Sequence, residues 1–327
     1  MKTMDLHGHV WTFRPYVAHM LRPKAPPPSR HFRTFVEDPT RGRVRLTGRL
    51  TMPSELTLPS ETDLVVAIHG LGGSHRSHYM VDIAHDALAL GHACLRVNLR
   101  GADRFGTDYY HAGLTADIVA VLQSPEVRAF RRVFLIGYSL GGHVSLRHAA
   151  EGACENVAGV AAICPPIDLA AGVVEIDKPK GRIYRRNVLR GLKDIYRGVA
   201  QRGAVPFDVK LADAIDTIRE WDERIIAPRH GFASADDYYA RTSVAPILHQ
   251  VRVPTLVVAT SKDPMVFEHI VRPHLEECAA VQTVFLDRGG HVGFPRGTQL
   301  GHGDSGSVAT QALRYLQRRA GPPCASA

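Results

Sequence analysis

The sequence predicts an α/β fold in which a mostly parallel central sheet is flanked by helices. Continuous apolar runs rich in β-branched residues recur along the chain, which is typical of strands buried on both faces of a parallel sheet. Segments of helical length separate these runs, as parallel crossover connections require. With 327 residues, of which 45% are hydrophobic, the chain can bury one large core of this kind. The expected strands cover residues 63–70, 92–101, 132–139, 157–164, 254–260 and 281–287.

The remaining segments complete this architecture. Residues 31–38 and 43–52 alternate polar and apolar side chains, which predicts an antiparallel pair at one edge of the sheet. After CPPIDL at 164–169, the alternation of strands and helices stops until Pro254, which predicts a helical insertion. Crossover helices are expected within 76–90, 111–123 and 140–151. We therefore expect an N-terminal extension with edge strands (1–60), a core (61–166 and 250–320), a helical cap insertion (167–249) and a flexible tail (321–327).

Charge and cysteine usage narrow the functional classes. The net charge of +8 is concentrated in residues 1–60 and 178–202, so the rest of the chain is net acidic, and a nucleic-acid partner is not expected. The five cysteines are scattered and match no metal-ligand spacing, which predicts free thiols in a reducing, cytoplasmic compartment. No run of eighteen apolar residues occurs, and the first twenty-one residues lack the features of a signal peptide.

The segment VFLIGYSLGG at 133–142 supplies a candidate nucleophile. Gly137-Tyr138-Ser139-Leu140-Gly141 fits the G-x-S-x-G pattern, in which a sharp turn between a strand and a helix lifts the serine hydroxyl above the sheet. The alternative is a glycine-rich turn in which Ser139 merely caps the following helix. The apolar strand before it and the expected helix after it favour the nucleophile.

A serine nucleophile needs a base and an acid, and later strands deliver candidates for both. His291 follows the last apolar strand in FLDRGGHVGF, and Asp263 follows the preceding strand in PTLVVATSKDPM. An acid in this position holds the imidazole in its reactive tautomer. Asp263 is alternatively a helix N-cap, and Asp168, after the strand that ends at Cys164, is the competing acid.

The negative charge that develops on a carbonyl oxygen requires fixed hydrogen-bond donors. The backbone N–H of Leu140, at the start of the helix after Ser139, is one candidate, and the N–H of Leu71 in HGLGGS is the second. His69 in the same loop is expected to be a structural hydrogen-bonding residue rather than a second base. His143 is expected to lie on the helix surface or to pack behind the turn.

Several ordered motifs between residues 60 and 295 resemble the YheT-like branch of the α/β-hydrolase superfamily. These motifs are HGLGGS, VNLRGA, YYHAGLTADI, GYSLGGH, PPIDL, DDYYARTS, KDPM and GGHVGF. The resemblance implies the α/β-hydrolase fold and a serine hydrolase acting on carboxylic esters, with Ser139, Asp263 and His291 as the triad. Two positions depart from the usual pattern: Lys262 precedes the acid, and His143 follows the glycine pair. Neither change removes a required group.

One basic segment leaves two interpretations open. In residues 181–202, Tyr184, Val188, Leu192, Ile195 and Val199 recur at helical spacing among many Arg and Lys residues. Such a helix either packs its apolar stripe on the core, which we expect, or lies on an anionic membrane surface in a weak peripheral association.

We therefore expect a cytoplasmic carboxylesterase that needs no cofactor or metal and cleaves short- to medium-chain acyl esters. A small-molecule ester is the expected substrate. The alternatives are a lipid-ester hydrolase or acyltransferase working at a membrane surface and, further off, a non-catalytic ligand-binding protein with a hydrolase fold. The sequence specifies neither the oligomeric state nor the physiological substrate.

Overall fold

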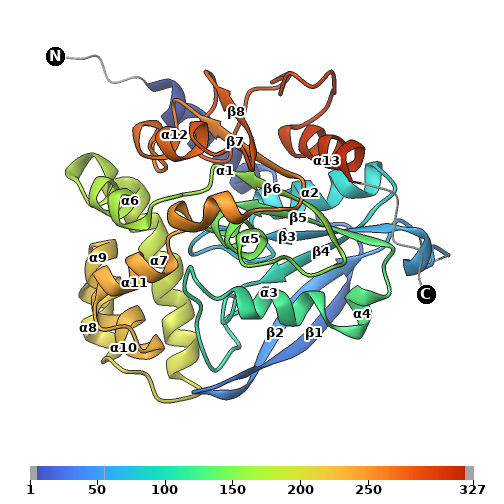
Figure 1. Cartoon of the computed structure of the whole chain (residues 1–327). Coiled ribbons are helices and arrows are strands. Elements are labelled where there is room, and N and C mark those ends of the chain that lie inside the picture. The colour runs from blue at the N-terminus through green and yellow to red at the C-terminus, as the bar shows by residue number, and fades with distance from the viewer. Residues whose placement is uncertain (1–5, 55, 321–327) are drawn as a thin grey trace.

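A single eight-stranded sheet organises the chain in a computed structural model, which describes residues 6–54 and 56–320 (Figure 1). The strand order is β1-β2-β4-β3-β5-β6-β7-β8. Strands β3 to β8 run parallel to one another, whereas β2 is antiparallel to both β1 and β4. The predicted parallel sheet and the predicted antiparallel edge pair are both confirmed. The strands are β1 (Arg30–Asp38), β2 (Gly42–Thr51), β3 (Asp63–Ile68), β4 (Ala93–Asn98), β5 (Arg132–Tyr138), β6 (Val157–Ile163), β7 (Thr255–Thr260) and β8 (Gln282–Leu286).

Helices cover both faces of this sheet, and alternate residues of each central strand face opposite layers. In β3, Leu64 and Val66 join one buried cluster, whereas Val65 and Ala67 join the other. The first cluster includes residues of α3 (Thr115–Leu122), α4 (Pro125–Arg128), α5 (Leu140–Ala150) and α12 (Glu268–Glu276). The second includes residues of α2 (His78–Ala89) and α13 (Val308–Arg319). Burial on both faces explains why these strands are apolar without alternation.

Between β6 and β7 the described chain forms helices and no strand, and we call this segment the cap. In Figure 1 the cap helices gather beside one end of the sheet. The long helix α7 reaches the loop after β3, where a Cβ added to Gly72 would lie 2.9 Å from the Val188 carbonyl oxygen. The cap therefore lies over the carboxyl ends of the strands. Its elements are α6 (Leu169–Ile176), η2 (Pro179–Gly181), α7 (Arg182–Ala200), α8 (Val209–Ala214), α9 (Ile218–Trp221), η3 (Asp222–Ile226), α10 (Ala227–His230), α11 (Ala235–Thr242) and η4 (Ala245–Gln250).

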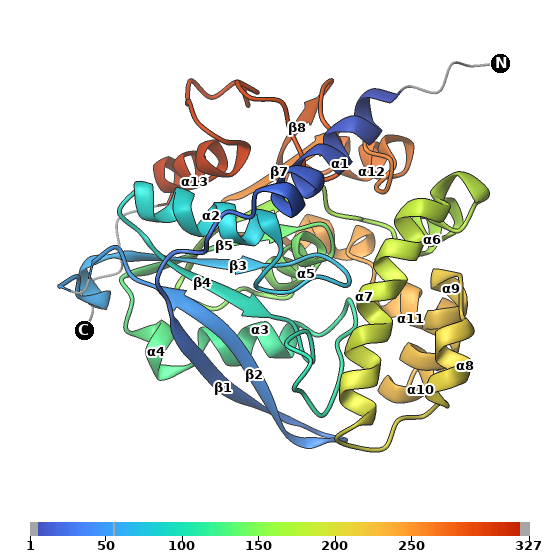
Figure 2. The same ribbon diagram turned by 180° about the vertical axis from the view of Figure 1, so that it is seen from behind.

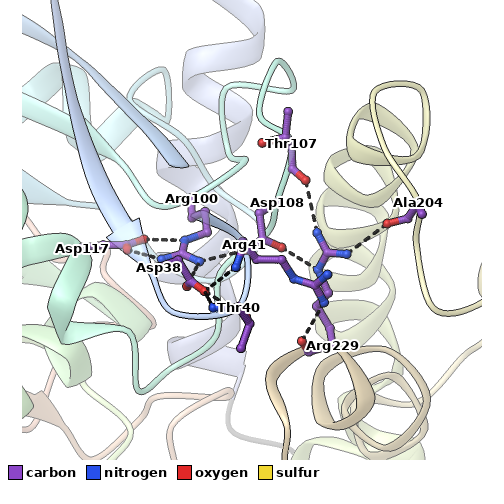
Figure 3. A network of polar contacts seen from close by, with 9 residues as sticks. All are labelled: Asp38, Thr40, Arg41, Arg100, Thr107, Asp108, Asp117, Ala204 and Arg229. Carbon is purple, nitrogen blue, oxygen red and sulfur yellow. Dashed lines mark hydrogen bonds and ion pairs between the residues drawn. The ribbon is translucent and has the colours of Figure 1, made fainter. Parts of the chain in front are cut away.

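A buried ionic network fastens the cap to the core (Figure 3). Arg100, which follows β4, binds Asp117 through two nitrogens and also contacts Asp38 and Asp108. Asp108 in turn accepts a hydrogen bond from Arg229 of the cap at 2.7 Å. Burial lowers the pKa of Arg100, but the hydrogen bonds and charges of the three carboxylates outweigh burial and raise it well above its usual range. The network therefore joins the edge hairpin, the core and the cap through buried polar side chains, with Arg100 at its centre.

An N-terminal helix, α1 (Leu6–Leu21), is an element that the sequence did not predict. It lies across the side of the sheet formed by β7 and β8 and close to α2, as Figure 2 shows in dark blue. The following residues, Pro23 to Ser29, are neither helix nor strand and connect α1 to β1. The η1 turn (Pro59–Glu61) precedes β3. Within the described ranges, no helix is long and apolar enough to cross a bilayer. The predicted tail at 321–327, including Cys324, lies outside the described residues.

Candidate active site

Ser139 lies in a strained turn between β5 and α5. Its φ of 53° and ψ of −120° place it in a backbone region that L-residues rarely adopt, and its N–H donates to the Ile163 carbonyl oxygen at 2.8 Å. The flanking glycines permit this turn: a Cβ at Gly137 would lie 2.2 Å from the Gly141 oxygen, and one at Gly141 would lie 2.2 Å from the Ile68 oxygen. The sequence pattern thus folds into the strand–turn–helix that presents a serine above a sheet.

His291 and Asp263 meet although 28 residues separate them. The His291 Nδ1 atom lies 2.8 Å from Asp263 Oδ2, and both side chains are buried. Because the carboxylate only accepts, Nδ1 carries the proton of the neutral ring, which leaves Nε2 as the acceptor. The other oxygen of Asp263 accepts from the N–H groups of Met265 and Val266 at 2.8 and 2.9 Å. The carboxylate thus also orders the turn after β7.

The competing acid has a different task. Asp168 is the N-cap of α6, and its Oδ1 accepts a hydrogen bond from the Ala171 N–H at 3.0 Å. This is the capping arrangement that we had considered for Asp263. The geometry therefore favours Asp263 as the partner of His291.

Ser139 and the His291–Asp263 pair lie at the same edge of the sheet, on either side of Cys164. Cys164 follows β6 and has a φ of 49°. Its thiol donates to the carbonyl oxygen of Gly290, the residue directly before His291, at 3.9 Å. Val292, with a φ of 53°, is also strained. Three strained non-glycine residues thus follow the ends of β5, β6 and β8, as is common at functional sites. Among the described residues, no hydrogen bond joins Ser139 to the His291 ring.

The two predicted oxyanion donors flank Ser139. A Cβ at Gly70 would lie 3.1 Å from the Ser139 Cβ, so the loop after β3 adjoins the serine. In that loop the Gly70 N–H donates to the Tyr79 hydroxyl at 3.0 Å, and the Gly72 N–H donates to the Tyr110 hydroxyl at 2.7 Å. In the described chain, the intervening Leu71 N–H has no hydrogen-bond partner. The Leu140 N–H, at the first position of α5, has none there either. Both groups are therefore free to bind an oxyanion.

His69, near this loop, has the structural role expected of it. Its Nδ1 atom lies 2.8 Å from the Gly70 oxygen, and its Nε2 accepts from the Leu99 N–H at 3.1 Å. Burial lowers the pKa of His69 to about 4, so the ring is neutral and holds the loop to the end of β4.

His143 is fully buried, so the surface alternative is wrong and the packing alternative is confirmed. Its two ring nitrogens lie 2.8 Å from the Pro166 oxygen and 2.9 Å from the Thr242 oxygen. Burial lowers the pKa of His143, so the neutral ring donates to one of these carbonyls. The histidine thus packs α5, directly behind Ser139, against the backbone at Pro166 and Thr242 and donates a hydrogen bond to one of them.

Helix α1 forms part of the surroundings of the site, which sequence reasoning missed. The Thr12 hydroxyl accepts a hydrogen bond from the His291 backbone N–H at 2.8 Å. A hollow of about 1460 Å³ opens on another side of α1, towards α2 and residues 292–309. Tyr138 and Val292 line this hollow, whereas Ser139 and His291 do not, so it lies behind the candidate site. No part of the pattern at 6–21 pointed to His291.

Together, the sheet order, the strained serine turn after β5 and the hydrogen-bonded Asp263–His291 pair after β7 and β8 are typical of the α/β-hydrolase class. Comparison with known proteins agrees. Residues 65–300 match the alpha/beta hydrolase family, and the chain belongs to this family. The chain is also similar to the YheT-like members of this family. It is 32% identical over 249 residues to the putative esterase YheT of Escherichia coli, and the aligned region covers 72% of each chain.

Two further comparisons are more distant. The human phospholipase ABHD3 is 23% identical over 308 residues, which is 90% of this chain and 75% of that protein. The crystal structure of the esterase Pf2001 of Pyrococcus furiosus superposes with a TM-score of 0.56 at 17% identity, covering 90% of this chain and 94% of the other, and supports the fold. The family and its named esterases identify this protein as a carboxylic ester hydrolase.

Proposed function

We propose that the protein cleaves carboxylic esters with short- to medium-chain acyl groups through a Ser139–His291–Asp263 triad and an acyl-enzyme intermediate. The observation that carries this proposal is the 2.8 Å contact between His291 Nδ1 and Asp263 Oδ2 at the sheet edge where Ser139 is presented. That contact fixes the ring tautomer in which Nε2 accepts a proton, which is the form a serine nucleophile requires.

The mechanism follows from these groups. His291 Nε2 takes the proton of the Ser139 hydroxyl as the serine oxygen attacks the ester carbonyl. The Leu71 and Leu140 N–H groups bind the resulting oxyanion. His291 then protonates the leaving alcohol, which yields the acyl-enzyme, and activates a water molecule that releases the acid. Asp263 stabilises the imidazolium that forms in both halves without taking its proton.

Labelling tests this proposal directly. A fluorophosphonate should modify Ser139 in the folded protein, as mass analysis of peptides detects. A panel of p-nitrophenyl esters of increasing acyl length should be hydrolysed by the wild type and not by Ser139→Ala. Ser145→Ala is the matched control, because Ser145 is a buried serine on α5 whose hydroxyl bonds the Gly141 carbonyl. It should keep labelling and activity. A folded wild type without an adduct on Ser139 would support the non-catalytic alternative.

A second candidate, hydrolysis of lipid esters at an anionic membrane surface, is favoured by helix α1. Helix α7, for which a membrane surface was the alternative to packing on the core, buries its apolar residues from Tyr184 to Val199. Helix α7 therefore packs as a cap helix. Helix α1 instead exposes Val10, Val17 and Leu21 in one stripe beside Arg14. An exposed apolar stripe with cations suits a lipid surface, and a relative is named a phospholipase.

Vesicle binding distinguishes this candidate. The protein should sediment with vesicles containing anionic lipid at low salt and be released at high salt. The double variant Val17→Glu, Leu21→Glu should lose binding yet keep hydrolysis of soluble esters. Leu211→Glu is the control, because Leu211 is 58% exposed on cap helix α8. Unchanged binding by the α1 variant, or no binding at low salt, would contradict a lipid surface.

Two related questions complete the proposal. An added alcohol that captures the acyl group in competition with water would indicate an acyltransferase. For localisation we propose the cytoplasm, because Cys94, Cys154, Cys164 and Cys278 are free thiols in the described chain, which suits a reducing compartment.

A further inference from the structure

Helix α1 packs backbone against backbone on the two loops that carry the candidate acid and base. A Cβ added to Gly8 would lie 1.6 Å from the carbonyl oxygen of Lys262, directly before Asp263. On the other loop, a Cβ at Gly290 would lie 2.2 Å from the Gly8 oxygen, and one at Gly293 would lie 2.1 Å from the Trp11 oxygen. Glycine at these positions permits an approach that any other residue would block. The backbone of helix α1 therefore lies against both the loop of Asp263 and the loop of His291.

One side chain of α1 completes the hydrogen bonding of the histidine loop. Thr12 Oγ1 donates to the Gly8 carbonyl oxygen at 2.8 Å, which aims a lone pair of that oxygen at the His291 N–H, also at 2.8 Å. The same loop is closed on itself by a bond from the Gly290 N–H to the Gly293 oxygen at 2.8 Å. The His291 backbone is thus fixed from two sides.

This support acts where the backbone is strained. Val292 has a φ of 53°, a left-handed conformation that a β-branched residue rarely adopts. Such a conformation persists only where surrounding contacts enforce it. The Thr12 hydrogen bond to the adjacent residue supplies one such contact. Without it, we expect the loop to relax and the imidazole to leave the position set by Asp263.

The same helix also contacts the cap. His9 Nδ1 is hydrogen-bonded to the Tyr184 hydroxyl at 2.5 Å, and the Phe13 ring stacks on the Tyr184 ring at 5.1 Å. Burial, followed by the negative charge of Asp263, raises the pKa of Tyr184 to about 12. Helix α1 thus touches the acid loop, the base loop and the cap helix.

We propose that Thr12 is a positioning residue of the ester hydrolase, which orients His291 through its backbone and so makes helix α1 part of the active site. The proposal rests on the function proposed above, because it assigns Thr12 a role in that same site. It predicts that Thr12 acts on the chemical step and not on substrate affinity. The group that matters is the hydroxyl oxygen, since this atom accepts the hydrogen bond from the His291 N–H.

Paired substitutions test the hydroxyl. Thr12→Val keeps the shape of the side chain but leaves the His291 N–H without an acceptor. We expect kcat on a soluble p-nitrophenyl ester to fall about tenfold with KM unchanged, and the pH profile of kcat/KM to shift, because the imidazole is held less firmly. Thr12→Ser, which retains the oxygen, should restore both. Equal losses in the two variants, no loss in either, or a change in KM alone would overturn the proposal.

A glycine pair tests the packing of the helix. Gly8→Ala places a methyl group against the Lys262 oxygen, so it should displace α1 and lower kcat at least as much as Thr12→Val. Gly172→Ala is the control, since it also adds a methyl group to a helical glycine but meets nothing within 4 Å. Thermal unfolding of each variant separates loss of folding from loss of alignment. A fully active Gly8→Ala would count against α1 as part of the site.

Two further measurements separate this inference from the proposed function. Absence of fluorophosphonate labelling at Ser139 of the wild type would refute the hydrolase mechanism and, with it, a catalytic role for Thr12. If the fluorophosphonate modifies Ser139 equally fast in the wild type and in Thr12→Val, only the positioning role of Thr12 is refuted. Amide hydrogen exchange of His291 reports the contact itself, and it should be faster in Thr12→Val than in Thr12→Ser.

Discussion

The carboxylate of Asp263 serves two partners with its two oxygens: Oδ2 lies 2.8 Å from His291 Nδ1, while Oδ1 accepts from the N–H groups of Met265 and Val266. The first contact sets the tautomer of the base and the second sets the turn that presents the acid. We expect Asp263→Asn to lower kcat by about 10³ to 10⁴, because an amide in this place favours the wrong tautomer. Steady-state kinetics on a p-nitrophenyl ester measure the loss.

Asp168→Asn provides the matched comparison for that prediction. Asp168 caps α6 and does not contact His291 in the structure, and Asn is an equally good capping residue. Its activity should stay within about twofold of wild type. A large loss in Asp168→Asn with a small loss in Asp263→Asn would identify the other aspartate as the acid.

The Tyr110 hydroxyl supports the loop that offers the Leu71 N–H. Removing it in Tyr110→Phe leaves the Gly72 N–H without its acceptor, so we expect the loop to move and kcat to fall about tenfold. Tyr109→Phe is the control, because its hydroxyl donates to the Ile225 oxygen of the cap rather than to this loop. Comparable kcat values for the two variants would argue against Leu71 as an oxyanion donor.

The link between Arg229 and Asp108 should stabilise the fold. Both side chains are buried, and Arg229 also donates to the Ala204 and Thr107 oxygens (Figure 3). Arg229→Gln should lower the free energy of unfolding by about 3 kcal/mol, because it leaves buried acceptors without their cation. Urea denaturation measures this. Arg219→Gln breaks an exposed pair with Asp236 and should cost less than about 1 kcal/mol. Equal costs would mean that the buried network adds little.

Asp222 should make stability depend on pH. Burial raises its pKa to about 7, and its Oδ2 accepts from the Tyr239 hydroxyl. A folded-state pKa above the unfolded value means that the folded protein binds more protons between about pH 4 and 7, so stability falls as the pH rises through this range. Asp222→Asn removes the ionisable group.

The test of Asp222 compares unfolding at two values of pH. At pH 8 we expect Asp222→Asn to be more stable than wild type by a few kcal/mol, roughly the size of the pKa shift, with little difference at pH 4. Circular dichroism during urea titration gives both values. A variant that is destabilised equally at the two pH values would show that Asp222 has the same pKa in the folded and the unfolded protein, which would contradict the prediction.

Much of this arrangement was predictable because it follows from local patterns. Apolar runs of strand length gave the parallel sheet, and parallel strands end at a common edge, so Ser139, Asp263 and His291 were expected to lie near one another. Glycines around Ser139 indicated the tight turn, since small residues are what such a turn requires. The apolar runs and the glycine pattern are both local in the sequence, because each can be recognised within a single strand and the residues next to it.

Helix α1 was missed because its stability comes from distant contacts. Its sequence includes Gly8 and Pro15, which are unfavourable inside helices, and its apolar stripe faces outward instead of into the core. The glycine that weakens the helix is required by the Lys262 carbonyl, which lies 254 positions later in the chain. The sequence of residues 6–21 alone therefore gives no indication of the contact with Lys262.

The ionic network shows the same limit. Asp117 on α3 accepts two hydrogen bonds from Arg100, which follows β4. The contacts of Arg100 with Asp38 and of Asp108 with Arg229 span 62 and 121 residues, respectively. Which buried charges meet at such separations is decided by the packing of complete elements. A pattern within a single element does not specify it.

The hydrogen bond between Thr12 and His291 joins residues 279 positions apart, and this separation bears on biosynthesis. Ribosomes make helix α1 before the histidine loop, so α1 has no docking site on that loop while the residues between them are being made. Closing so long a loop is among the entropically costly steps of folding and is expected to come late. A nascent chain would therefore remain without an aligned base until the histidine loop has been made and docked on α1, and hydrolytic activity would begin only after that step.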